Sequence, residues 1–205
     1  NPSGVKKSNP LHSSISILGT SVGLGKRLKW PDDFFQIYYE ASYQRYYVRN
    51  YNSSFIFGDG IANSIALTAT LSRNSVDAPL FQYPRRGSQL SFSLEATPPF
   101  SAFAPANKNY TDLPPNEKYK WIEYHKWKFS ASVFTKLTGN LVANFRANFG
   151  FLGYYNKQIG AAPFERFYLG GDGLSNFSLD GREIIALRGY ENESLTPVEY
   201  IPGQG

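Results

Sequence analysis

The chain of 205 residues contains no cysteine and two histidines, and it has no long uninterrupted apolar run. Its apolar stretches fall well short of the ~18 residues that a membrane-spanning helix needs, which excludes a transmembrane helix. The missing cysteine suits an oxidising envelope compartment, although many cytosolic domains also lack it. His12 and His125 lie far apart with no metal-ligand spacing around them, which argues against a zinc site.

The basic residues form no continuous run, since the net charge is only +5 and the Lys and Arg residues are scattered among aromatic residues. We therefore expect no binding to nucleic acid. What the chain does have is 41% hydrophobic and 17% aromatic residues, at a mean hydropathy of −0.38. The strands of a membrane barrel give such an average, because apolar and polar residues alternate along them.

Alternation with a period of two predicts an all-β, antiparallel fold. The clearest strand is the last, in which Leu141, Ala143, Phe145, Ala147, Phe149 and Phe151 alternate with Val142, Asn144, Arg146, Asn148 and Gly150. One face of such a strand suits lipid and the other suits a water-filled lumen. The predicted strands cover about 15–29, 34–48, 64–72, 88–97, 120–137 and 141–155, followed by a long extracellular loop over 156–205.

The connections between these strands run short, long, moderate, long, short and very long. Membrane barrels have short turns on the periplasmic side and long loops outside, so the order predicts a transmembrane β-barrel. The moderate connection at 73–87 fits this order least well. Aromatic residues gather at the predicted strand ends, as interfacial girdles require, at Trp30, Phe34, Tyr46, Tyr47, Trp121, Tyr154 and Tyr155.

Six strands cannot close a lipid-facing barrel, for which about eight are needed. An open sheet would leave unpaired backbone groups in hydrocarbon. We therefore expect the chain to be part of one larger barrel, with the remaining strands outside this sequence. The opening residues, Asn1–Gly4, do not read as a signal peptide, so we expect a removed signal or an internal piece of a longer protein.

Several motifs favour simpler interpretations when their spacing is tested. The stretch 19–26 is similar to a phosphate-binding loop but lacks its first glycine and its final Ser or Thr. The glycines and aspartates at 170–173 and 180–181 occur once, whereas calcium-binding repeats must stack. Sequences for N-glycosylation begin at Asn52, Asn109, Asn176 and Asn192, all in predicted loops. We predict no catalytic residue, no metal, no cofactor and no enzymatic activity.

Two motifs in the long loop, a pair of glycines and an Arg-Gly-Tyr sequence, together indicate a specific loop conformation. Gly170 and Gly171 free the backbone to bend sharply as the chain leaves the wall. Arg188 offers a planar fork of donors beside Gly189, and Tyr190 adds a flat ring for packing. We interpret the pair as a tether inside the lumen rather than an ordinary exposed loop. The predicted site residues are Phe167, Tyr168, Gly170 and Gly171 at the loop base and Arg188, Gly189 and Tyr190 in the functional motif.

These motifs resemble the outer-membrane barrel of the BamA assembly-factor family. In that family the sixth extracellular loop carries Val/Ile-Arg-Gly-Phe/Tyr and folds back into the lumen. The resemblance covers most of the chain, including the turn at 30–33, the connection at 83–87 and the strand exit at 97–99. It implies that the predicted strands are the sixth to eleventh of a sixteen-stranded barrel, and that the POTRA domains lie outside this sequence.

The resemblance implies a protein of the Gram-negative outer membrane that folds and inserts β-barrel proteins. Its partners would be nascent outer-membrane proteins, the accessory lipoproteins of the BAM complex, outer-membrane lipid and the rest of its own barrel. Arg188 would contact acidic or aromatic residues on later strands. Two departures are the long interval 172–187 and Leu187, where the family commonly has Val or Ile.

Other functions stay open on the sequence. Two-partner secretion transporters share the barrel and the loop motif, so secretion of a passenger protein is an alternative within the same superfamily. A porin-like diffusion channel would need the alternating wall but no Arg-Gly-Tyr tether. A soluble carbohydrate-binding sandwich would have to cover the apolar face of every strand with a second sheet.

Overall fold

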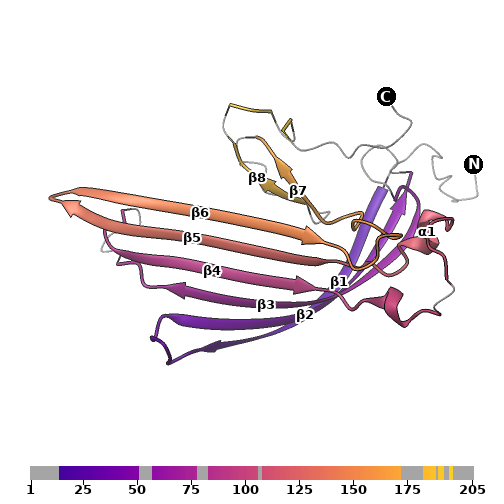
Figure 1. Cartoon of the computed structure of the whole chain (residues 1–205), viewed down its shortest axis with the longest axis horizontal. Coiled ribbons are helices and arrows are strands. Elements are labelled where there is room, and N and C mark those ends of the chain that lie inside the picture. Colours follow the sequence, from indigo (N-terminus) through magenta and orange to yellow (C-terminus); the bar gives the residue numbers. More distant parts are fainter. Residues whose placement is uncertain are drawn as a thin grey trace, which may run out of the picture. The chain divides into compact units, whose positions relative to one another are not determined.

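The structure is a computed structural model that describes residues 14–50, 57–77, 83–105, 108–171, 182–187, 189–191 and 194–195. The chain divides into two compact units, Asn1–Ala161 and Ala162–Gly205. In the described part of the first unit, six strands form one antiparallel sheet in sequence order (Figure 1). The only helical elements in the described residues are two single turns, η1 (Phe100–Phe103) and α1 (Pro115–Lys118), so the all-β prediction is confirmed. No helix in these ranges has the length and apolar character to cross a membrane.

The six strands are long and consecutive neighbours pair along most of their length. Figure 1 shows them as a curved, twisted sheet with the short connections at one end and α1 near the other. The strands are β1 (Ser14–Arg27), β2 (Phe35–Arg49), β3 (Gly60–Asn74), β4 (Gly87–Ala96), β5 (His125–Thr138) and β6 (Leu141–Gly153).

The register gathers the apolar side chains of all six strands on one face, because alternate residues point to opposite sides of a sheet. One row across this apolar face consists of Leu24, Tyr39, Ala69, Leu94, Trp127 and Phe151. The neighbouring row on the opposite, polar face consists of Gly25, Tyr38, Thr70, Ser93, Lys128 and Gly150.

The apolar face is not covered by the rest of the unit. Leu24 on β1 is 75% exposed and Phe145 on β6 is 68% exposed, so large apolar side chains are open at both edges of the sheet. A soluble protein rarely leaves so extended an apolar surface in water. The face is instead suited to the hydrocarbon of a bilayer.

The buried core lies at the end of the sheet that carries the long connections. Short connections, 28–34, 75–86 and 139–140, occupy the opposite end. At the long-loop end, side chains from the strand ends, from the connection 97–124 and from the residues after β6 are packed out of solvent. The buried apolar residues of this core are Tyr46, Val48, Phe57, Ala62, Ala66, Tyr110, Tyr119, Ile122, Tyr124 and Ile159.

Two predicted strand ranges are wrong. The strand predicted at 64–72 extends over Gly60–Asn74, and the strand predicted from 120 begins at His125. β3 begins at Gly60 because its ladder with β2 continues to the Val48–Gly60 pair. On its other side, β4 pairs with β3 only as far as Leu67. The segment just before β5 borders the start of β3 on that side instead of continuing β5. The Asn63 amide donates to the Lys120 carbonyl (3.0 Å), and the Ile122 amide donates to the Asn63 carbonyl (2.9 Å). The other predicted strands end within a residue or two of the observed bounds.

Candidate functional site

The second unit contains a short parallel ladder where a plain loop was predicted. The segment β7 (Arg166–Leu169) pairs with β8 (Arg182–Ile185), and Phe167 lies opposite Glu183. Alternation does not reveal this pairing, because four-residue strands are too short to show a period. The predicted loop-base residues Phe167 and Tyr168 thus lie in a strand, and the interval that separates the two motifs includes the partner strand.

Gly170 and Gly171 join the loop base to the second motif. The Gly170 amide donates to the Ile185 carbonyl (3.1 Å), and the Gly171 amide donates to the Tyr190 carbonyl (3.0 Å). The Gly171 carbonyl in turn accepts from the Leu187 amide (2.9 Å). Both glycines have positive φ, +126° and +93°, in a region that residues with a Cβ rarely occupy. The predicted sharp bend is therefore present, and it brings the loop base beside the second motif.

Leu187 and Tyr190 are the ends of a tight turn. The Tyr190 amide donates to the Leu187 carbonyl (3.4 Å), and Gly189, the third residue of the turn, has φ of +92°. A positive φ at this position is typical of a type II turn and favours glycine. The Tyr190 side chain is half exposed. Arg188 lies outside the described residues, so its contacts stay a prediction.

The polar face of the sheet carries an acidic groove of about 380 Å³. Glu40 on β2 and Glu95 on β4 line it, together with small and hydroxyl side chains such as Ser42 and Thr68. The Tyr124 hydroxyl donates to a carboxylate oxygen of Glu95, which fixes that group. Such a surface can accept a cationic or hydrogen-bonding group from the water-filled side.

The core at the long-loop end contains a buried carboxylate. Glu123 accepts hydrogen bonds from the Ser101 amide and from the Ser101 hydroxyl (2.8 Å). Burial, and secondarily the Glu123 charge, raise the pKa of Tyr110. Because a buried polar group is tolerated only when it is hydrogen-bonded, these contacts tie the backbone at Ser101 to Glu123.

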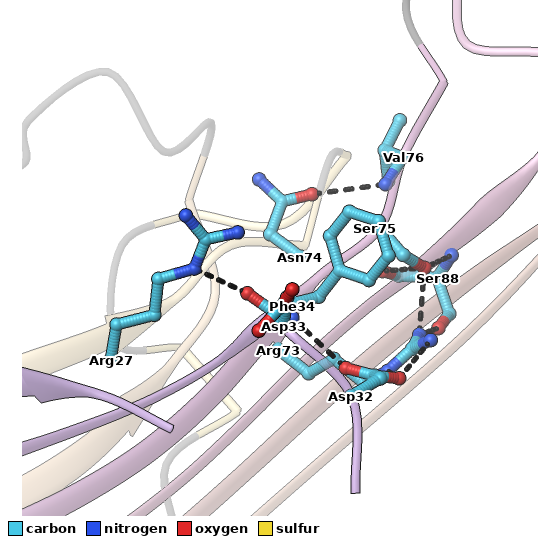
Figure 2. Close-up of polar contacts among 9 residues, drawn as sticks. All are labelled: Arg27, Asp32, Asp33, Phe34, Arg73, Asn74, Ser75, Val76 and Ser88. Carbon is cyan, nitrogen blue, oxygen red and sulfur yellow. Dashed lines mark hydrogen bonds and ion pairs between the residues drawn. The ribbon is translucent and has the colours of Figure 1, made fainter. Parts of the chain in front are cut away.

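Arg73 organises the short-turn end of the sheet, as Figure 2 shows. Its guanidinium donates to the Asp32 carboxylate at 2.9 Å and 2.8 Å and to the hydroxyls of Ser75 (2.7 Å) and Ser88 (2.5 Å). It also lies 5.7 Å from the ring centre of Phe34. We call this set of contacts the Arg73 clamp. It ties the β1–β2 turn to β3 and to the start of β4.

The Asp32 carboxylate also bonds locally within its own turn, since it accepts from the Phe34 amide (3.0 Å). The hydrogen bond from Arg73, aided by the one from Phe34, holds the pKa of Asp32 below its ordinary value. Alternation alone does not identify Arg73, since its partners lie in three separate segments of the sequence.

These features define the class of protein. A sheet of long antiparallel strands, with one face apolar and exposed and the other polar and grooved, is the wall of a transmembrane β-barrel. The Omp85 superfamily domain matches residues 6–204, and the chain belongs to this superfamily. Its members are outer-membrane β-barrel proteins, which assigns the chain to an outer membrane, and they include both BamA and the two-partner secretion transporters. No curated protein matches the chain.

Proposed function

We propose that the chain is part of a BamA-type assembly factor that folds and inserts β-barrel proteins into the bacterial outer membrane. The observation that carries the proposal is the junction between the two loop motifs. Hydrogen bonds of Gly171 to Leu187 and Tyr190 hold the Arg-Gly-Tyr turn against the Phe-Tyr-x-Gly-Gly element. A diffusion channel has no need of a loop folded in this way.

The proposed role is to lower a kinetic barrier rather than to perform chemistry. Insertion of a barrel is downhill once its strands can pair, since unpaired backbone groups are costly in hydrocarbon. A barrel that deforms lipid and offers strand edges for templating shortens that step. The partners would be nascent outer-membrane proteins, accessory lipoproteins, lipid and the rest of its own barrel. Arg188 would hold a conformation by binding acidic or aromatic groups on later strands.

The proposed place of the chain is the sixth to eleventh strands of a sixteen-stranded barrel, ending in the sixth extracellular loop. The succession of six long strands and the loop motifs after β6 support this placement. The interval 172–187 is longer than is usual in the family and includes β8, so part of it extends the loop base as a second strand.

The test is depletion of the full-length protein, followed by quantification of many unrelated outer-membrane barrel proteins. We expect a broad fall that wild type rescues. Arg188→Ala should rescue poorly, with about tenfold less of the tethered conformation, because a hydrogen bond to a charged group contributes roughly 1.5–3 kcal/mol. Arg182→Ala, which removes the same charge from the same loop, is the matched control and should rescue fully.

Unchanged barrel levels after depletion would overturn the assembly function. Loss of one secreted passenger, with other barrels unaffected, would then identify a two-partner secretion transporter. Loss of small-solute uptake alone would identify a porin-like channel. Equal rescue by the Arg188 and Arg182 variants would contradict the proposed tether role of Arg188 but not the assembly function.

A further inference from the structure

The short-turn end of the sheet bears exposed cations that form no ion pair within the described residues. Lys29 lies in the β1–β2 turn, and Arg85 and Arg86 precede β4. All three side chains are exposed, and none is in an ion pair within the described residues. Of the acidic residues at this end, Asp32 is bound by Arg73, while Asp33 and Asp77 are exposed and form no ion pair within the described residues. The undescribed stretch 78–82 between the two arms adds no charge of either sign.

The Arg73 clamp fixes the two cationic turns relative to one another. One arm of the guanidinium reaches Asp32 in the first turn, and another reaches Ser75 and Ser88 at the base of the second (Figure 2). Beyond Ser88 the β3–β4 pairing continues, since the Asp77 amide donates to the Arg86 carbonyl (2.9 Å). The cationic residues are therefore held by hydrogen-bonded backbone at one rim of the sheet.

Two aromatic side chains accompany these cations. Trp30 is 83% exposed and Tyr83 is 71% exposed, so neither ring is used for packing within the protein. Trp and Tyr favour the boundary between hydrocarbon and headgroups, where the ring is partly dehydrated and the polar atom stays wet. Arg86 pairs with Asp77 in continuation of the β3–β4 register, so by alternation it lies on the side of Leu90, at the border of the apolar face.

We infer that the rim formed by Lys29, Trp30, Tyr83, Arg85 and Arg86 binds the phosphate headgroups of anionic phospholipids in the adjacent leaflet. The Arg and Lys side chains supply donors and charge to the phosphate. The aromatic rings fix the depth of the rim at the headgroup level. At the long-loop rim the lysines are accompanied by Asp59, Asp112 and Glu117, and at the short-turn rim Asp33 and Asp77 accompany the three cations. The headgroup binding therefore rests on the combination of the cations with Trp30 and Tyr83 rather than on an excess of charge alone.

The experiment compares binding of phosphatidylglycerol and phosphatidylcholine to the detergent-solubilised full-length protein, by native mass spectrometry across a lipid titration. The test variant is Lys29→Gln/Arg85→Gln/Arg86→Gln. The matched control is Lys108→Gln/Lys120→Gln/Lys157→Gln, which removes the same charge from exposed lysines near the long-loop end. Heat-modifiable migration on a gel verifies that each variant is folded.

We expect wild type and control to prefer phosphatidylglycerol and the test variant to lose that preference by roughly tenfold or more, since each cation near an anionic surface contributes about 1 kcal/mol. Inorganic phosphate should not displace the lipid, because it offers nothing for the rings to contact. Equal preference in all three proteins would overturn the proposal, as would equal loss in both variants. An unchanged lipid preference with lost binding of an acidic accessory protein would assign the rim to that protein instead.

Discussion

The two faces of the sheet differ in how much of each is exposed to solvent. The apolar face stays exposed from β1 to β6, as Leu24 and Phe145 illustrate. The polar face is buried only at its long-loop end, where Tyr46 and Ala62 lie in a small core, and it is open where Glu40 lines a groove. A soluble sheet shows the reverse, with its apolar face inside. The difference means that the two faces have different solvents, lipid for one and water for the other.

A pair of adjacent substitutions on β6 tests this difference with the largest expected effect. Ala147 lies near the middle of the strand on the apolar face, and Asn148 lies next to it on the polar face. Ala147→Arg should lower the free energy of unfolding by about 2–4 kcal/mol, the cost of a cation near the bilayer midplane. Asn148→Arg should change it by less than about 0.5 kcal/mol, as ordinary surface substitutions do.

The measurement is urea unfolding of the full-length protein in lipid vesicles, with the protein's own barrel intact. Similar losses for the Ala147 and Asn148 variants would mean that the two faces do not differ in solvent. A larger loss for Asn148→Arg would reverse the assignment of lipid and lumen.

This assignment could be predicted from the sequence because alternation is a local property. Each strand carries its own pattern, and the last one alternates regularly from Ala143 to Phe151. The parallel bridge from Asn63 to Trp121 could not be predicted, because it joins segments that are far apart in the sequence. The same holds for the Arg73 clamp, whose partners come from separate turns.

The loop site shows the same division. Gly170 and Gly171 indicate a bend from local sequence, and the structure has positive φ at both. The turn that contains Gly189 was not predicted, and the tether through Arg188 stays a prediction. The hydrogen bonds that join the two motifs span the interval 172–187, whose fold no local pattern specifies. Local sequence therefore predicted the bend at the two glycines, while the pairing between the two motifs required the structure.

Two glycines on the polar face differ in how much room they leave for the neighbouring Tyr38 ring. A Cβ on Gly23 would lie 2.0 Å from the Tyr38 hydroxyl oxygen, whereas a Cβ on Gly25 would lie 3.5 Å from the same ring. Gly23→Ala must therefore displace Tyr38, and we expect a loss of about 1 kcal/mol, the low end for overpacking because the ring can swing toward solvent. Gly25→Ala is the matched control and should be nearly neutral.

Urea unfolding in vesicles again provides the measurement. The double variant Gly23→Ala/Tyr38→Ala should lose no more stability than Tyr38→Ala alone, because the clash is then absent. Equal effects of the Gly23 and Gly25 substitutions would show that the ring does not need the space.

The smallest expected effect concerns a charged side chain that the register places at the border of the apolar face. Arg73 lies opposite Leu90, and Asp32 neutralises it there. Because this contact lowers the pKa of Asp32, it adds stability at neutral pH that is lost as the pH falls below about 3.8 and through the lowered folded-state value. Unfolding of wild type and Asp32→Asn should therefore differ at neutral pH and converge in acid. The control is Asp33→Asn, whose side chain makes no ion pair within the described residues, and it should show no such convergence with wild type. If the difference in unfolding free energy between wild type and Asp32→Asn persisted in acid, ionisation of Asp32 would not be what stabilises Arg73.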